Sequence, residues 1–266
     1  MISYTAAHRP LHAIKKIMFV RLFLSAIFSL PVLHASIPGE LMQRAGAAEA
    51  RQDSRSALEL YQRADRNAPD NPIILQKIAR QYSDLVAEQS DIAGKKHYAE
   101  IALEYSQRAV ALDPQNAVNV LSLAVCHGKL ALYGDTREKV KYSRLVWEET
   151  QRALALDPNY AWAHHVLGRW NYEVATLNGV SKFFVKLFYS ELPPASVNEG
   201  VRQLQIATKL EPDELSHWLE LGFAYLAAGE NDQARSQWNH CLAMHSRGVY
   251  DDLAMKRARA ELAKLD

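Results

Sequence analysis

The histidines are the residues of this chain best suited to chemistry, because imidazole binds metals and transfers protons near neutral pH. His164 and His165 are adjacent, and His217 and His240 follow later in the chain. Neighbouring helical positions point about 100° apart, so His164 and His165 would not bind one metal from one face. The sequence also contains no Gly-rich phosphate loop, CxxC pair, HExxH motif or nucleophile elbow. We therefore predict no catalytic residue, metal site, cofactor or enzymatic activity.

The other reactive side chains are typical of structural roles. Adjacent acids such as Glu148 with Glu149 and Asp251 with Asp252 are typical of a solvated helix surface. Cys126 and Cys241 are too few for a disulfide framework, and each stands where a small residue is expected. We predict that both cysteines are buried free thiols.

Binding is the chemistry that remains. Arg80 and Arg169 could bind an anion, and apolar and aromatic side chains at equivalent positions could surround an apolar ligand. The candidates lie four to fourteen residues after a recurring proline; they are Arg80, Leu121, Val125, Trp162, His165, Arg169, Tyr172, Leu219 and Phe223. Repeat domains that grip a terminal carboxylate use several Lys, Arg and Asn residues. The mostly apolar set favours an amphiphile with an acidic head.

The prolines belong to a phrase that recurs four times: Ala64-x4-Pro69, Ala109-x4-Pro114, Ala153-x4-Pro158 and Ala207-x4-Pro212. The last copy precedes Trp218-x2-Leu221-Gly222-x2-Tyr225 and then Ala234, Trp238 and Cys241. This is the spacing of a tetratricopeptide repeat, in which stacked helix pairs create a concave surface. We predict an all-α, right-handed tetratricopeptide-repeat solenoid of about five helix pairs, capped by a C-terminal helix over 251–265.

Composition is that of one soluble globular domain. Hydrophobic residues make up 48% and charged residues 23%, and 11 glycines leave little room for flexible linkers. The middle repeats are longer than 34 residues, which places insertions at 86–100, 133–143 and 176–196. We predict one solenoid domain over 36–266. Each repeat of a solenoid contacts its neighbours, so distant repeats are not expected to touch.

The third insertion has the pattern of an amphipathic helix. Phe183, Phe184, Leu187 and Phe188 lie on one face, with Lys182 and Lys186 on the other. This helix could enter a membrane interface through its aromatic face. It could also fold back and fill the groove, because so short a helix is marginal in water without a surface to dock on.

The N-terminus has the layout of a secretory signal. Four basic residues precede the uncharged run 22–33, and the small residues Ala35 and Ser36 follow it. We predict a signal peptide or N-terminal anchor over 1–35, and hence a periplasmic or secreted protein. The alternatives are a membrane anchor over 17–33 and mitochondrial targeting. No basic stripe remains beyond this segment, so we predict no nucleic-acid partner.

Three segments carry a family resemblance. Residues 163–174, the turn 191–196 and residues 252–255 resemble the regulator of microtubule dynamics family, over roughly residues 55–265. That family includes members associated with microtubules and a membrane-anchored mitochondrial member whose repeat domain tethers to the endoplasmic reticulum and binds phospholipids. The resemblance implies that the helix with Leu167 to Trp170 and the turn with Leu192 to Pro194 shape a binding cavity. We do not expect tethering, because the signal-like segment runs almost directly into the first repeat.

Two functions follow from these observations. The first is a protein-interaction scaffold, with tubulin as the partner only if the host is eukaryotic. The second is a carrier of a phospholipid or another acidic amphiphile, in contact with a membrane surface, which would use an apolar concave groove. Neither function is enzymatic.

Overall fold

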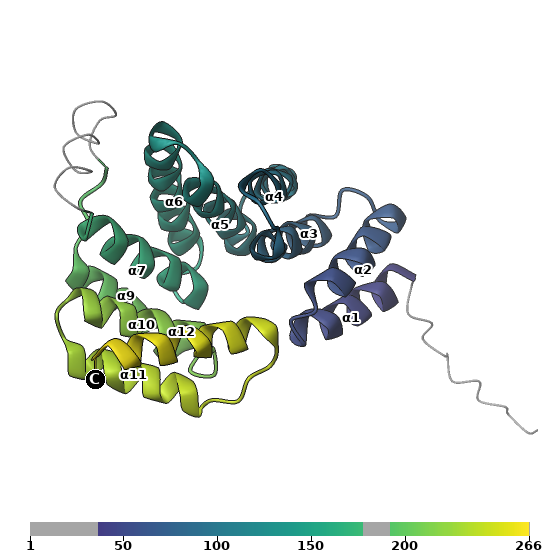
Figure 1. The fold of residues 1–266 in the computed structure, drawn as a ribbon. Coiled ribbons are helices and arrows are strands. Elements are labelled where there is room, and N and C mark those ends of the chain that lie inside the picture. Colours follow the sequence, from purple (N-terminus) through teal and green to yellow (C-terminus); the bar gives the residue numbers. More distant parts are fainter. Residues whose placement is uncertain (1–36, 178–191, 266) are drawn as a thin grey trace, which may run out of the picture. The chain divides into compact units, whose positions relative to one another are not determined.

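The computed structural model describes residues 37–177 and 192–265, which lie in one compact unit, Ala35–Asp266. Within these ranges the chain forms eleven α-helices, one 3₁₀ turn and no strand (Figure 1). The predicted all-α class is confirmed. The predicted signal or anchor over 1–35 and the amphipathic segment containing Phe183, Phe184, Leu187 and Phe188 fall outside the described residues and stay predictions.

The helices pack as antiparallel pairs in chain order. The pairs are α1 (Ile37–Ala50) with α2 (Ser54–Asn67), α3 (Pro72–Leu85) with α4 (Ile92–Leu112), α5 (Ala117–Tyr133) with α6 (Thr136–Leu156), α7 (Ala161–Ala175) with α9 (Val197–Leu210), and α10 (Leu215–Ala227) with α11 (Asn231–Ala243). The closing helix α12 packs on α10 and α11 and spans Val249–Leu265, so it begins slightly before residue 251. This is the predicted tetratricopeptide-repeat arrangement.

The first two insertions lengthen helices. The first adds a 3₁₀ turn, Val86–Glu88, and a long α4, while the second extends the α5 and α6 pair. Helices α4 and α6 each have 21 residues, whereas α1, α2 and α3 each have 14. The third insertion falls largely within 178–191, outside the described residues.

Polar caps after the recurring prolines start the first helix of several pairs. The Oδ1 atom of Asn71 accepts a hydrogen bond from the Ile73 amide at 3.0 Å, and Asn116 does the same for Val118 at 3.0 Å. Glu214 caps α10 by accepting from the Ser216 amide at 3.2 Å. These side chains satisfy amide groups that have no partner inside the helix. The proline turn and its cap therefore set where each first helix begins.

Two close helix crossings explain the small residues of the pattern. Trp238 is 0% exposed, and its Nε1 donates to the Leu219 carbonyl at 3.1 Å. A Cβ atom added at Gly222 would collide with the Trp238 ring. In the preceding pair, a Cβ at Gly168 would lie 2.6 Å from Leu204 Cγ. The register predicted for the last repeat is therefore the one the chain adopts, and both cysteines are buried and free.

One expectation about the solenoid is wrong: distant repeats do touch. The turn between α1 and α2 contacts the start of α12, since Gln52 Oε1 accepts hydrogen bonds from the amides of Tyr250 at 2.7 Å and Asp251 at 3.1 Å. Gln52 Nε2 donates to Asp251 Oδ1 at 2.7 Å, and the Tyr250 hydroxyl lies 3.0 Å from Ser54 Oγ. The Gln52 amide thus caps a helix 199 residues away in sequence.

Candidate functional site

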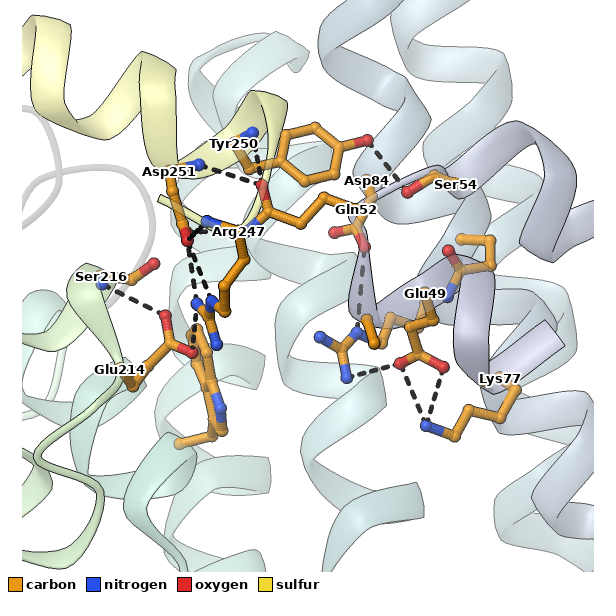
Figure 2. A pocket seen from close by; sticks show the side chains of 15 residues that line it. Glu49, Gln52, Ser54, Lys77, Asp84, Glu214, Ser216, Arg247, Tyr250 and Asp251 are labelled. Carbon is orange, nitrogen blue, oxygen red and sulfur yellow. Dashed lines mark hydrogen bonds and ion pairs between the residues drawn. The ribbon is translucent and has the colours of Figure 1, made fainter. Parts of the chain in front are cut away.

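A charged stripe on α3 forms one wall of a pocket. Lys77, Gln81 and Asp84 follow the i, i+4, i+7 spacing of one helix face, with Arg80 beside them. Figure 2 shows Lys77 on one side of the pocket, and Glu214 and Ser216, at the start of α10, on the other side together with Arg247. The pocket has a volume of about 440 Å³ and is lined by Gly46, Glu49, Ala50, Gln52, Ser54, Lys77, Arg80, Gln81, Asp84, Trp162, Glu214, Ser216, Arg247, Tyr250 and Asp251. Segments far apart in the sequence therefore share one charged site.

Glu49 of α1 is the centre of the first ion-pair group. Its carboxylate accepts from Lys77 Nζ at 3.0 Å and from the Tyr61 hydroxyl at 2.6 Å, and Arg80 Nη1 lies 2.8 Å away. Burial acts to raise the pKa of Glu49, but Arg80, Tyr61 and Lys77 outweigh it and hold the pKa below its ordinary value. Lys77 and Arg80 are thereby fixed against α1.

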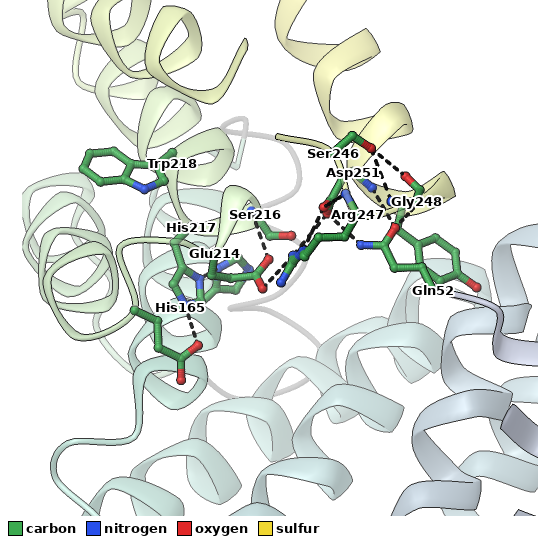
Figure 3. A network of polar contacts seen from close by, with 12 residues as sticks. Gln52, His165, Glu214, Ser216, His217, Trp218, Ser246, Arg247, Gly248 and Asp251 are labelled. Carbon is green, nitrogen blue, oxygen red and sulfur yellow. Dashed lines mark hydrogen bonds and ion pairs between the residues drawn. The ribbon is translucent and has the colours of Figure 1, made fainter. Parts of the chain in front are cut away.

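Arg247 is the centre of the second group, on the opposite wall (Figure 3). Its Nε donates to Asp251 Oδ2 at 2.9 Å, and its Nη2 donates to Glu214 Oε2 at 2.9 Å. The hydrogen bonds from Arg247 to Asp251 raise the pKa of Arg247, which stays charged. Since Asp251 also binds Gln52, this group joins the α1–α2 turn, α10 and α12.

The third feature of the pocket is a pair of side chains on α3, Gln81 without a hydrogen-bond partner and Asp84 with a long ion pair. Gln81 is 0% exposed, and neither its Nε2 nor its Oε1 has a hydrogen-bond partner among the described residues. The nearest cationic atom to the Asp84 carboxylate is Arg80 Nε, at 3.9 Å. Burial raises the pKa of Asp84, although Arg80 and Lys129 act against it. Gln81 and Asp84 are thus the least satisfied polar groups of the pocket wall.

The predicted candidates Trp162 and His165 lie beside this pocket. The Trp162 ring lines the pocket and packs on the imidazoles of His165 at 4.9 Å and His217 at 4.8 Å between ring centroids. The two Nδ1 atoms of the histidines are 2.9 Å apart, so one imidazole donates to the other. Burial lowers the pKa of His165 to about 3 and that of His217 to about 4, which keeps both neutral. Within the described ranges no group of metal-ligating side chains is large enough to hold an ion.

Arg169, Tyr172 and Phe223 belong to a separate cluster around the buried Glu220. The Tyr172 hydroxyl donates to Glu220, Arg169 also pairs with Glu173 at 2.8 Å, and the Arg257 guanidinium lies 4.8 Å from the Phe223 ring centroid. Burial acts to raise the pKa of Glu220, but Arg169 and Arg257 outweigh it and lower the pKa. Arg80 and Arg169, predicted as open anion contacts, therefore both already pair with carboxylates.

The remaining predicted residues have packing roles in the structure. Leu121 and Leu219 are buried in separate core clusters, and Val125 packs against the cluster that contains Leu121. The lining of the described pocket also differs from the expected apolar groove, because most of its side chains are polar or charged. The apolar residues at these positions after the prolines, such as Leu121 and Leu219, instead pack neighbouring helices together.

The segments implied by the family resemblance also pack the scaffold. Gly168 sits at the crossing of α7 and α9, and Trp170 Nε1 donates to the Ser143 carbonyl of α6 at 2.8 Å. The Ser196 amide, after the turn with Leu192 to Pro194, donates to Asn171 Oδ1 at 3.2 Å. These contacts orient α7, which carries Trp162 into the pocket.

Sequence reasoning missed most of the charged pocket. Gln81 directly follows the predicted position Arg80, and Asp84 lies four residues after Arg80, so a wider helix face would have included both. Glu49 gave no such signal, because it reaches the pocket from α1 through its contact with α3 of the next helix pair. Gln52 and Arg247 gave none either, because they meet at Asp251 through the contact between the two ends of the repeat series.

No helix in the described part of the chain is long and apolar enough to cross a membrane. This finding concerns residues 37–177 and 192–265 alone.

Known proteins resemble the chain in both sequence and fold. A model of the family "Regulator of microtubule dynamics protein 1-3" matches residues 41–266. Regulator of microtubule dynamics protein 2 of Mus musculus is 24% identical over 192 residues, 72% of this chain and 47% of that protein. Protein 3 of Xenopus laevis is 29% identical over 143 residues, 54% of this chain and 31% of that protein. The chain thus spans less than half the length of these relatives.

A solved structure supports the fold. The thermophilic TPR protein TTC0263 of Thermus thermophilus superposes with a TM-score of 0.62 at 21% identity, covering 85% of this chain and 99% of that one. This likeness concerns the fold alone, whereas the family match covers nearly all of the repeat region. The chain therefore belongs to the regulator of microtubule dynamics protein 1-3 family.

Proposed function

We propose that this chain is a non-enzymatic scaffold that binds a segment of a partner protein in the charged pocket. The observation that carries the proposal is the Gln81 amide, which lines the pocket without a partner among the described residues. An unsatisfied buried polar group costs ~1–3 kcal/mol. A peptide backbone would remove this cost, because it offers an N–H to Oε1 and a carbonyl to Nε2.

The form of the pocket supports the same function. Its walls come from α1, α3, α7, α10 and α12, so an occupant would contact several repeats at once. Ion pairs already hold Lys77, Arg80 and Arg247 in place. Side chains that are ordered before binding lose less conformational entropy on association, which favours affinity. A volume of about 440 Å³ suits a few residues of an extended segment.

The alternative is the amphiphile carrier. Charged groups line the described pocket, and the predicted groove residues Leu121 and Leu219 are buried in the core, so we favour the scaffold. Mass spectrometry of an organic extract of the purified protein distinguishes the two functions. A phospholipid in near-stoichiometric amount would favour the carrier, and its absence would favour the scaffold.

The identity of the protein partner is a further part of the proposal. The names of the relatives refer to microtubule regulation, and the chain spans under half of their length. We therefore propose tubulin as a partner only if the chain comes from a eukaryote. Co-sedimentation of the full chain with assembled microtubules tests this choice, and a protein that stays in the supernatant would exclude it.

The scaffold proposal is tested with a pool of random nine-residue peptides passed over the immobilised full chain. We compare the wild type with Gln81→Met, which keeps the side-chain length and removes the amide. Gln76→Met is the matched control, since Gln76 lies on the same helix but not in the pocket lining. We expect the wild type and the control to retain peptides and Gln81→Met to retain at least tenfold less. No retention by the wild type, or equal retention by all three proteins, would contradict the proposal.

A further inference from the structure

The cations that line the pocket are already neutralised. Lys77 Nζ lies 3.0 Å from Glu49, and Arg80 Nη1 lies 2.8 Å from the same carboxylate. Arg247 is 2.9 Å from both Glu214 and Asp251. An acidic group from a partner would have to displace one of these carboxylates, so the pocket offers an anion little net attraction.

Asp84 is the most weakly paired carboxylate of the pocket. The pocket is lined by four acidic residues and three basic ones. Among the described residues the cation within 4.0 Å of the Asp84 carboxylate is Arg80, at 3.9 Å, and Arg80 lies closer to Glu49, at 2.8 Å. No described residue donates a hydrogen bond to the Asp84 carboxylate, and its side chain is 34% exposed. Burial raises the pKa of Asp84, and the charges of Arg80 and Lys129 only partly offset this effect. The carboxylate is thus partly exposed and only weakly compensated by cations.

Two further groups of the pocket lining, Gln81 and Trp162, complete a site for a cation. Gln81 lies one helical turn before Asp84, on the same face of α3, and its fully buried Oε1 has no donor among the described residues. Trp162 contributes an aromatic ring to the same pocket, and His165 and His217 pack on that ring. A guanidinium has five N–H donors and a flat face, so it can donate to carbonyl and carboxylate oxygens while it contacts an indole.

We propose that the pocket recognises a basic segment of a partner protein and seats an arginine or lysine side chain at Asp84, Gln81 and Trp162. This inference rests on the proposed function, because it names the chemistry of the segment that the scaffold binds. The main chain of the segment pairs with the Gln81 amide, and its cation neutralises Asp84. The same carboxylate would repel acidic segments.

The test sequences the peptides that the full chain retains from the random pool, at about 0.15 M salt. The wild type is compared with Asp84→Asn, which removes one negative charge from the pocket at nearly constant shape. Asp252→Asn is the control, since Asp252 is an exposed acid at the start of α12 and is absent from the pocket lining. Circular dichroism of each variant verifies the helical fold before the peptides are compared.

We expect arginine and lysine to be enriched at least tenfold over the input with the wild type and with Asp252→Asn. Asp84→Asn should lose this enrichment while it still retains peptides. Retained peptides that are neutral or acidic, or equal enrichment with Asp84→Asn, would overturn the basic-segment inference and leave the scaffold proposal standing. A wild-type chain that retains no peptide would overturn the scaffold proposal itself, together with the inference.

Discussion

The contact between the first turn and the last helix can be tested by removing a single amide. Gln52→Ala deletes the hydrogen bonds to the Tyr250 amide, the Asp251 amide and the Asp251 carboxylate. Gln52 has a φ of 57°, and alanine at this position keeps a Cβ and therefore most of the same backbone strain. The change in stability of this variant therefore reports the loss of the side-chain amide and not a change in the conformation of the turn.

The expected cost follows from those three bonds. A neutral hydrogen bond contributes ~0.5–1.5 kcal/mol and one to a charged group ~1.5–3 kcal/mol. Asp251 keeps its bonds to Arg247, so the bond from Gln52 to its carboxylate counts as no more than a neutral one, and we expect a total loss of ~2–4 kcal/mol. For a domain of this size the melting temperature should fall by roughly 4–16 °C.

Thermal unfolding of the full chain, followed by circular dichroism, measures this loss. The control is Gln62→Ala, which removes one hydrogen bond to the Tyr82 hydroxyl and should lower the melting temperature by roughly 2–4 °C. Hydrogen exchange at the amides of Tyr250 and Asp251 should quicken in Gln52→Ala and stay unchanged in Gln62→Ala. If Gln52→Ala melts like the wild type, the two ends do not touch in solution and the reasoning about the pocket walls fails.

Three further predictions concern stability. Gly222→Leu should lower the free energy of unfolding by ~1–3 kcal/mol or more, because a side chain there meets the Trp238 ring. Gly46→Ala should instead stabilise α1 by ~0.5–1 kcal/mol, because the space around a Cβ at this position is open. Equal melting temperatures of the two variants would refute this packing. Gln81→Met should raise the free energy of unfolding by ~1–3 kcal/mol in urea titration, since it removes an unpartnered amide, and a loss of stability would mean that the amide has a partner. The pKa of Glu49 is depressed in the folded state, so the stability that Glu49 contributes is present above about pH 5 and is lost as the pH falls through that depressed pKa. Glu49→Gln should therefore flatten the acid side of a plot of melting temperature against pH. An unchanged plot would contradict this prediction.

The fold could be predicted because its signals are local. The proline phrase, the cap that follows it and the pairing of Gly222 with Trp238 all lie within a single repeat. Their spacing is set by helix geometry, which does not depend on the rest of the chain. The family resemblance rested on three other short segments, 163–174, 191–196 and 252–255, and the family match confirms it.

The pocket could be predicted only in part, because its chemistry comes from contacts between repeats. Arg80 and Trp162 were found from their register, yet the partner of Arg80, Glu49, belongs to a different helix pair. Gln52 and Asp251 meet across most of the sequence, which contradicts the assumption that each repeat contacts its neighbours alone, and Asp251 also binds Arg247. Leu121 and Leu219 were predicted to line the groove but are buried in the core. The register of a helix alone does not distinguish an apolar groove residue from an apolar core residue.

Hydrogen exchange with mass spectrometry of the full chain, with and without one peptide enriched from the random pool, tests the central claim most directly. The claim is that a partner segment binds between α3 and the start of α12. We predict that the bound peptide slows exchange at the backbone amides of residues 77–85 and 246–251, and leaves α6 (Thr136–Leu156) unchanged. Slower exchange confined to helices outside the pocket, with residues 77–85 and 246–251 unaffected, would contradict the claim.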